Sequence, residues 1–380
     1  NSTTERRCNM FNFKKNDTFS GIDFRDQYIT TAKVQIQNNK PVLFDIDVID
    51  TKISIIENSR IADIKSIADL LKEKVLDKHV HLAFPTQNII VRRITSLPDL
   101  KEEALAKLLQ YQVGESIHLP FEKSIYDFVK IGTIKAEPDE QLDIEKLTAV
   151  EFASELREKE TDKADILFFA TSLPLSEDIL EVSIQAGLKP LSAEIRGTAL
   201  QRLISHTNPE WLRETEMVVD LSKESIDIHI FANETIAFSR TMTVGAMETE
   251  QEDLFSASDV LPFDGFVESL VEAAVSVEET AIYEETYIND VVTEIEKAQN
   301  FFRFSLSKGN SNFKRVIVTG KNACQFVSVL SDRLEVEVVD LDFSKIVSEN
   351  FPKKDLLNST SVAIGLALKG NESVKKKWKK

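Results

Sequence analysis

The chain has 380 residues, 42% of them hydrophobic and 29% charged, which is the composition of a globular protein with more than one core. Its formal net charge of −17 excludes a broad nucleic-acid-binding face, because such a face must neutralise phosphates. No run approaches about 18 apolar residues, and the start lacks the apolar core of a signal peptide. Cys8 and Cys324 lack metal-ligand spacing. The sequence therefore indicates a cytoplasmic protein with free thiols.

Strand-like and helix-like segments alternate along the chain, which predicts an α/β fold. Residues Asn1–Asn9 resemble a leader, with Met10 as the natural start. Strands are predicted at Phe19–Asp23, Ile29–Ile36, Pro41–Ile49, Val80–Phe84, Ile89–Thr95, Ile166–Thr171, Leu191–Ile195, Met217–Leu221, Ile226–Phe231, Glu234–Thr243, Val316–Thr319 and Val336–Val339. Helices are predicted at Ile61–Leu76, Lys101–Val113 and Ser176–Ala186, before Gly187, and in a segment that runs through Leu330.

Two segments about two hundred residues apart look alike. Phe19–Asp23 and Met217–Asp220 are apolar runs that end in aspartate, and an alternating strand follows each of them. A strand, an acidic tip and a second strand form the phosphate-holding hairpin of actin-like ATPases, which occurs twice in that fold. The chain carries Arg25 and Ser222 where this chemistry needs glycine, so the pattern predicts the fold with damaged phosphate loops.

The segment from Met247 to Glu296 is strongly acidic and predicts helices with carboxylate-rich outer faces. The pairs Glu278-Glu279 and Glu284-Glu285 have the chemistry of a metal or acid–base site, but a solvated helix face explains them better. At the end of the chain, Lys375–Lys380 places a tryptophan among five lysines. This composition suits an anionic membrane surface, although six residues are too few for a stable helical anchor.

A run of specific motifs lies between residues 90 and 130: Val91-Arg92-Arg93-Ile94, Leu97-Pro98, Tyr111-Gln112-Val113, Leu119-Pro120-Phe121-Glu122 and Tyr126-Asp127-Phe128. In these motifs the sequence resembles the PilM family of type IV pilus assembly proteins. More diffuse similarities extend the resemblance to about residues 11–370, at Ser20–Asp23, Ala186–Pro190, Val219-Asp220, Phe238–Arg240, Gly245, Thr319-Gly320 and Ala363–Leu368. The resemblance implies an α/β, actin-like ATPase fold of two RNase H-like halves, related to the division protein FtsA and to the type II secretion protein GspL.

The same resemblance suggests how the chain divides. Its first half comprises 17–83 and 175–210, with an inserted α+β subdomain at 84–174. The second half comprises 211–246 and 305–370, with an acidic helical subdomain at 247–304. A flexible leader at 1–16 and a basic tail at 371–380 flank these parts.

In the resembled family, Asp23 and Asp220 would hold Mg²⁺ and Gly320 would adjoin the adenosine. The family's glycines are replaced here by Arg25, Ser222, Lys321 and Asn322. Each added side chain blocks the close approach of backbone to phosphate. The sequence therefore disfavours ATP and Mg²⁺ as cofactors. Asp23, Asp220 and Gly320 are predicted to be the remains of a nucleotide site. We predict a pseudo-ATPase, with no catalytic residue assigned and no metal site.

The resemblance implies a cytoplasmic scaffold on the inner face of the cytoplasmic membrane. Its partner would be a PilN-like, or a GspL- or GspM-like, single-span membrane protein, and it would act with the assembly ATPase complex. Ile90 and Phe121 are the candidate pocket contacts for the partner's N-terminal tail, and Arg92 or Arg93 is available to a carboxylate or carbonyl.

Three alternatives remain open at this point. The nucleotide site could belong to an active ATPase with a remodelled pocket. The basic tail could belong to an FtsA-like polymerising membrane tether. The assembly that the protein serves could be a type IV pilus or a type II secretion system.

Overall fold

The computed structural model describes residues 18–38, 40–74, 76–136, 161–245, 285–306, 312–347 and 354–377. The leader and most of the acidic segment, including Glu278, Glu279 and Glu284, lie outside these ranges. Glu285 is the first described residue of a helix that runs to residue 301, and it is exposed. Within the described ranges, no helix is long and apolar enough to cross a membrane.

The first sheet has the strand order β10-β6-β1-β2-β3. An antiparallel meander forms one side of it, and two further strands join in parallel with β1 on the other side. The strands are β1 (Thr18–Phe24), β2 (Tyr28–Gln37), β3 (Lys40–Asp50), β6 (His79–Phe84) and β10 (Lys189–Ile195).

The second sheet repeats this plan with the order β13-β12-β11-β14-β15. Its meander is again antiparallel, and its last two strands again run parallel to the first. The strands are β11 (Thr215–Leu221), β12 (Ser225–Ala232), β13 (Thr235–Thr243), β14 (Arg315–Gly320) and β15 (Glu337–Asp340). The predicted duplication is therefore confirmed.

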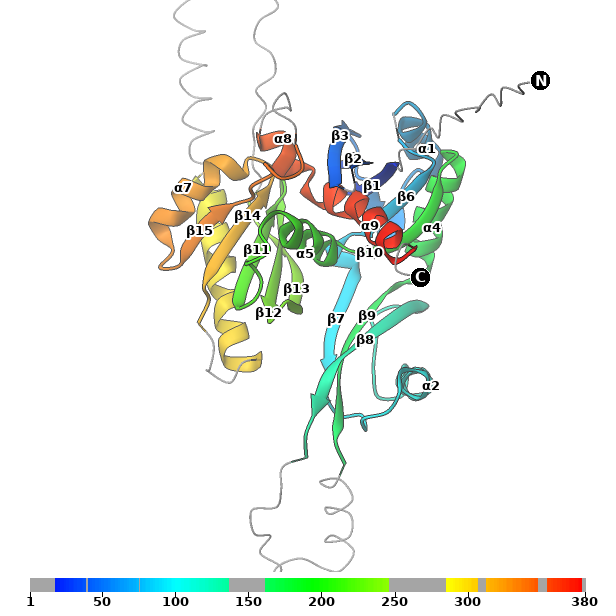
Figure 1. Cartoon of the computed structure of the whole chain (residues 1–380), viewed down its shortest axis with the longest axis vertical. Helices are drawn as coiled ribbons and strands as arrows, with labels where there is room; N and C mark the ends of the chain where they lie inside the picture. Colours follow the sequence, from blue (N-terminus) through cyan, green and yellow to red (C-terminus); the bar gives the residue numbers. More distant parts are fainter. Residues whose placement is uncertain are drawn as a thin grey trace, which may run out of the picture.

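Helices cover both faces of each sheet. Helices α5 (Arg196–Thr207) and α9 (Ser361–Lys377) lie between the two sheets, where their apolar residues form the central core (Figure 1). The outer face of the first sheet packs against α1 (Ile64–Lys72) and α4 (Leu173–Gln185). The outer face of the second sheet packs against the helix at 285–301, the π-helix η4 (Phe302–Leu306) and α7 (Ala323–Arg333). The short helix α8 (Lys354–Ser359) leads into α9.

One predicted helix starts later than expected. The periodicity predicts a helix from Ile61, but residues Arg60–Ile61 form β5, which pairs with β4 (Ile56–Glu57). Helix α1 begins at Ile64 because the Asp63 carboxylate accepts a hydrogen bond from the backbone N–H of Ser66, which caps the helix.

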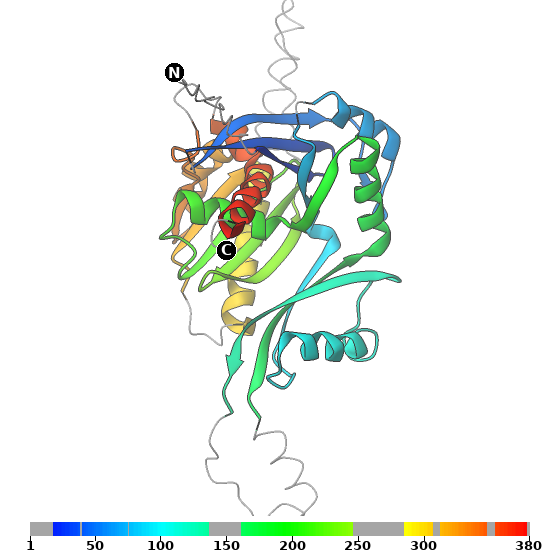
Figure 2. The ribbon, with the colours of Figure 1, turned by 45° about the vertical axis from the view of Figure 1, so that its right-hand side comes forward.

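A third sheet, with the order β7-β9-β8, projects away from the two halves (Figures 1 and 2). It follows the 3-10 turn η1 (Thr86–Asn88) and consists of β7 (Ile89–Ile94), β8 (Ser124–Ile134) and β9 (Lys163–Ser172). Helix α2 (Glu102–Gln112) packs on one face through Leu105 and Leu109. The opposite face contributes Leu167 and Phe169 to the central core. The inserted sheet thus has two faces with different surroundings.

Candidate functional site

The two strand-end aspartates occupy equivalent places in the two halves. Asp23 is the penultimate residue of β1 and pairs with Thr30 and Ala83, and Asp220 is the penultimate residue of β11 and pairs with Asp227 and Thr319. Both aspartates are fully buried. A buried carboxylate is stable only with a cation or several hydrogen-bond donors beside it, so each aspartate requires a partner.

Arg25 supplies a partner to both aspartates. Its Nε lies 2.7 Å from Oδ2 of Asp23. Its Nη2 and Nη1 lie 2.6 and 3.2 Å from the two carboxylate oxygens of Asp220, which comes from the other half of the chain. The side chain is 2% exposed. The guanidinium therefore lies between the two acidic tips and forms a two-point contact with the second of them.

A second arginine extends this set of charges. Arg196, the first residue of α5, places Nε 2.8 Å from Oδ1 of Asp23 and Nη1 2.7 Å from Oδ2 of Asp227. Its Nη2 donates to the carbonyl oxygen of Phe24 at 2.6 Å. We call Asp23, Arg25, Arg196, Asp220 and Asp227 the charge cluster. It alternates in sign, and it links the first half to the second through two arginines.

Electrostatics keep the arginines and Asp227 charged. Burial opposes the charge on Arg25, but the carboxylates of Asp220 and Asp23 hold its pKa well above the usual value of a guanidinium. Burial also disfavours ionised Asp227, yet attraction to Arg196 and the hydroxyl of Thr241 lower its pKa to about 2. These groups are therefore ionised at neutral pH.

This arrangement does not fit a bound Mg²⁺ ion. Mg²⁺ needs free oxygen ligands at close range in octahedral geometry, and the carboxylate oxygens of Asp23 and Asp220 already accept hydrogen bonds from guanidinium groups. The cationic side chain of Arg25 lies between these two carboxylates, where a metal ion would have to be placed. We therefore derive no chemical step through ATP or Mg²⁺ here.

Gly320 lies next to the cluster for a packing reason. Its φ is +93°, and an added Cβ would stand 2.2 Å from the carbonyl oxygen of Leu221 and 2.6 Å from Oδ1 of Asp220. The glycine is therefore required by the contact between β14 and β11. Asn322, at φ +56°, adopts the left-handed conformation at a position where the resembled family has glycine.

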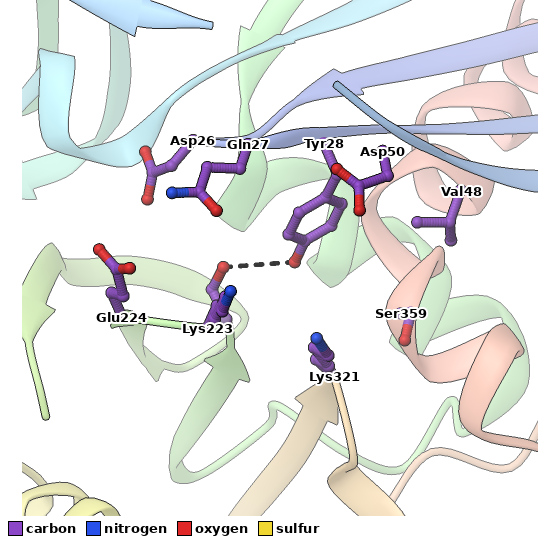
Figure 3. Close-up of a pocket in the computed structure, with 10 residues that line it drawn as sticks. Asp26, Gln27, Tyr28, Val48, Asp50, Lys223, Glu224, Lys321 and Ser359 are labelled. Atoms are coloured by element: carbon purple, nitrogen blue, oxygen red, sulfur yellow. Dashed lines mark hydrogen bonds between the residues drawn. The ribbon is translucent and has the colours of Figure 1, made fainter. Parts of the chain in front are cut away.

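A cavity of about 270 Å³ lies between the halves (Figure 3). Tyr28 and Asp50 line it from the first half, and Lys223 and Lys321 from the second. The hydroxyl of Tyr28 lies 3.3 Å from Oγ of Ser222, so the two halves also touch here. Burial and the nearby Lys223 ammonium lower the pKa of Lys321.

The lining of this cavity is electrostatically mixed. The carboxylates of Asp26, Asp50 and Glu224 lie around it together with the two lysines. The described residues that line it therefore form no strongly positive binding site for a triphosphate.

The residues predicted for partner binding separate onto different faces of the inserted sheet. Ile90 pairs with Ala170, and Arg92 pairs with Phe168, on the face that α2 partly covers. Arg93 lies on the opposite face and forms an ion pair with Asp165, with Nε 2.7 Å from Oδ1. Successive residues of a strand point to opposite sides.

Phe121 lies in the loop between α2 and β8 and is half-buried, as is Ile90. Arg92 is exposed. Ile90 and Arg92 are therefore accessible on one face, whereas the guanidinium of Arg93 is already engaged within the chain.

Sequence reasoning missed Arg196 and Asp227. Asp227 alternates with Ile226 and Ile228 in β12, and such alternation predicts a solvent-facing polar side chain. It is 3% exposed because the region between the halves covers it. One feature of the sequence could have indicated the cluster: Arg196 places a charged side chain directly after an expected strand.

Residues 21–371 match the family model described as Type IV pilus assembly protein PilM. The chain belongs to the PilM family. Among solved structures, the PilM-PilN type IV pilus biogenesis complex is 18% identical, with a TM-score of 0.66 over 93% of this chain and 98% of that chain.

Weaker similarities are to EutJ from Carboxydothermus hydrogenoformans, at 11% identity and a TM-score of 0.44 over 93% of this chain and 89% of that chain. MreB5 of Spiroplasma citri bound to ADP is 12% identical, with a TM-score of 0.36 over 95% and 98%. No curated protein matches. The PilM-family chain has the predicted actin-like ATPase fold, with a mixed α/β architecture.

Proposed function

We propose that this protein is a scaffold of the type IV pilus assembly platform that holds the N-terminal tail of a PilN-like single-span membrane protein without turning over ATP. Family membership supports the pilus rather than the secretion machine. The similar structure is described as a complex of PilM with PilN, which supports a partner of this class. The partner would place the scaffold at the cytoplasmic face of the inner membrane, where it would act with the assembly ATPase complex.

The observation that carries the nucleotide-independent part is the position of Arg25. An actin-like ATPase needs its two strand-end carboxylates for a metal ion and for water. Here both carboxylates are bound to one guanidinium from within the chain. We therefore favour a scaffold over an ATPase with a remodelled pocket.

The face of the inserted sheet that carries Ile90 and Arg92 is the proposed binding site for the partner's N-terminal tail. Ile90 is only half-buried, and Arg92 presents an exposed guanidinium one row further along the same face. Phe121 supplies a half-buried aromatic ring from the loop between α2 and β8. An extended tail would gain apolar contacts from Ile90 and Phe121, and Arg92 would bind a carboxylate or carbonyl on it.

Two single variants test this binding site. We expect Arg92→Ala to weaken capture of the tail by about 1–2 kcal/mol, because it removes a charge-assisted contact. Arg93→Ala is the matched control, since it removes a neighbouring arginine whose guanidinium binds Asp165 on the opposite face. Pull-down of a PilN-like single-span protein, with melting temperatures recorded for both variants, gives the readout.

Equal capture by Arg92→Ala, Arg93→Ala and the unaltered protein would remove this face from the binding site. A loss with Arg93→Ala alone would move the site to the other face of the sheet.

The FtsA-like alternative depends on the basic tail at Lys375–Lys380. Co-sedimentation with anionic vesicles, with and without Val374–Lys380, separates the two functions. The scaffold proposal expects the same membrane binding by both forms in the absence of the partner.

A further inference from the structure

Three buried carboxylates meet at the boundary between the two halves. Asp23 comes from the first half, and Asp220 and Asp227 come from the second. None is more than 3% exposed. Like charges brought together away from water repel strongly unless cations lie between them. The closed arrangement of the halves therefore depends on whatever cation fills this boundary.

Both cations that fill it come from the first half of the chain. Arg25 follows β1 directly, and Arg196 follows β10 directly. Each binds Asp23 in its own half and one aspartate across the boundary. The contact of Arg25 with Asp220 uses both terminal nitrogens, which fixes orientation as well as distance.

We propose that the charge cluster is a built-in clamp, in which the guanidinium of Arg25 takes the place of a bound cation and holds the two halves closed without any ligand. This inference goes beyond the proposed role in pilus assembly. It concerns the protein alone, so its test is independent of partner binding.

The clamp is expected to fix the separation of the two halves more than to raise the free energy of unfolding. Replacing a buried ion pair by apolar residues of similar volume is often neutral or stabilising, whereas removal of one partner is costly. What an ion pair adds is a defined separation and orientation of the groups it joins. The sharpest readout is therefore the separation of the two halves, and the melting temperature is a weaker one.

Other contacts also cross the boundary. The helices α5 and α9 form an apolar core with both sheets, and Lys369 of α9 pairs with Glu194 of β10 at 2.8 Å. The backbone N–H of Leu43 donates to the carbonyl of Ile346 at 2.7 Å, and Tyr28 reaches Ser222. The cavity between the halves contains lysines and carboxylates in mixture and does not specify a ligand that could close it. The cluster differs from these contacts in its position, because it joins the ends of β1 and β11, which lead into the two loops that line this cavity. It is therefore our candidate for the element that fixes the separation of these loops.

Double electron–electron resonance between two spin labels can measure this separation. Exposed Lys65 on α1 and exposed Ser328 on α7 provide one label site in each half. Both are changed to cysteine in a background in which Cys8 and Cys324 are changed to serine. The unaltered cluster should give one narrow distance distribution, with or without Mg²⁺.

Arg25→Gly is the first test variant. It leaves Asp23 and Asp220 without the guanidinium that joins them, so we expect the distance distribution to widen to roughly twice its width or to shift longer. Added Mg²⁺ should narrow it again, because the Oδ2 atom of Asp23 and the carboxylate of Asp220, both released by Arg25, can then share a divalent cation. Arg60→Gly is the matched control: Arg60 binds Asp178 within the first half, so its loss should leave the distribution unchanged.

The double variant Arg25→Met/Asp220→Leu covers the case in which Arg25→Gly does not fold. It removes the pair that spans the boundary without leaving Asp220 unpaired, so it should fold. It should still show the wide distribution, now without a response to Mg²⁺. An unchanged narrow distribution in either folded variant would overturn the clamp. If the distribution of Arg25→Gly widens and Mg²⁺ does not narrow it again, the proposal that the Arg25 guanidinium takes the place of a bound cation would be overturned.

Discussion

Gly365 of α9 lies against the backbone of Ala199 of α5, where an added Cβ would stand only 2.1 Å from the carbonyl oxygen of Ala199. These two helices lie between the two sheets and cross there in close contact (Figure 1). The absence of a side chain at Gly365 therefore sets how closely the two central helices approach each other.

Gly365→Ala should destabilise the protein by roughly 2–3 kcal/mol, because the helices must separate to admit the methyl group. Gly132→Ala in β8 is the matched control, since its Cβ would meet nothing nearer than 3.9 Å. Urea unfolding of the two variants provides the measurement. Equal stability of both would show that the helix crossing adjusts without cost.

His229 predicts how stability depends on pH. Burial lowers its pKa to about 4, although Asp227 nearby acts in the opposite direction. The unfolded chain therefore takes up a proton near pH 6.5, before the folded protein does. The contribution of neutral His229 is complete above about pH 6.5 and is lost as the pH falls toward 4, in total roughly 3 kcal/mol.

His229→Asn should flatten the dependence of the unfolding free energy on pH between about 7 and 5, whereas exposed His118→Asn should not. Below this range, protonation of the unfolded chain at the position of Asp227 removes a further part of the stability, as the pH falls from about 4 toward 2. A slope that His229→Asn leaves unaltered would contradict the assignment.

The nucleotide site gives a third prediction. Because Arg25 joins Asp23 to Asp220, we expect calorimetry with Mg²⁺ and ATP to give no saturable heat at micromolar concentrations. Binding in that range that disappears on Asp23→Asn or Asp220→Asn would establish a working pocket and would refute the pseudo-ATPase proposal.

The sequence was sufficient to predict the two matching sheets, because each hairpin carries its own local pattern of apolar residues and aspartate. It was also sufficient to question the phosphate loops, because Arg25 and Ser222 are visible in the sequence. The partner of Arg25 was not predictable, since Asp220 lies 195 residues away and only the packing of the two halves brings them together. Asp227 was overlooked because alternation alone does not reveal that both faces of a strand are covered.

The sequence was sufficient to predict that Arg92 and Arg93 lie on opposite faces of the inserted sheet, but the sequence analysis treated them as equivalent. Adjacent residues in a strand point to opposite sides, so only one of the two arginines could share a face with Ile90. The register of β7 with β9 identifies this residue as Arg92. The proposed binding site for the tail therefore contains a single arginine.

The most direct test of the account is to measure the affinity of a peptide with the sequence of the partner's N-terminal tail in the presence of EDTA, and again with Mg²⁺ and ATP. A scaffold whose halves are held by Arg25 should bind the tail equally well in both conditions. Arg92→Ala should weaken binding in both by the same factor. Binding that requires Mg²⁺ and ATP would contradict the account.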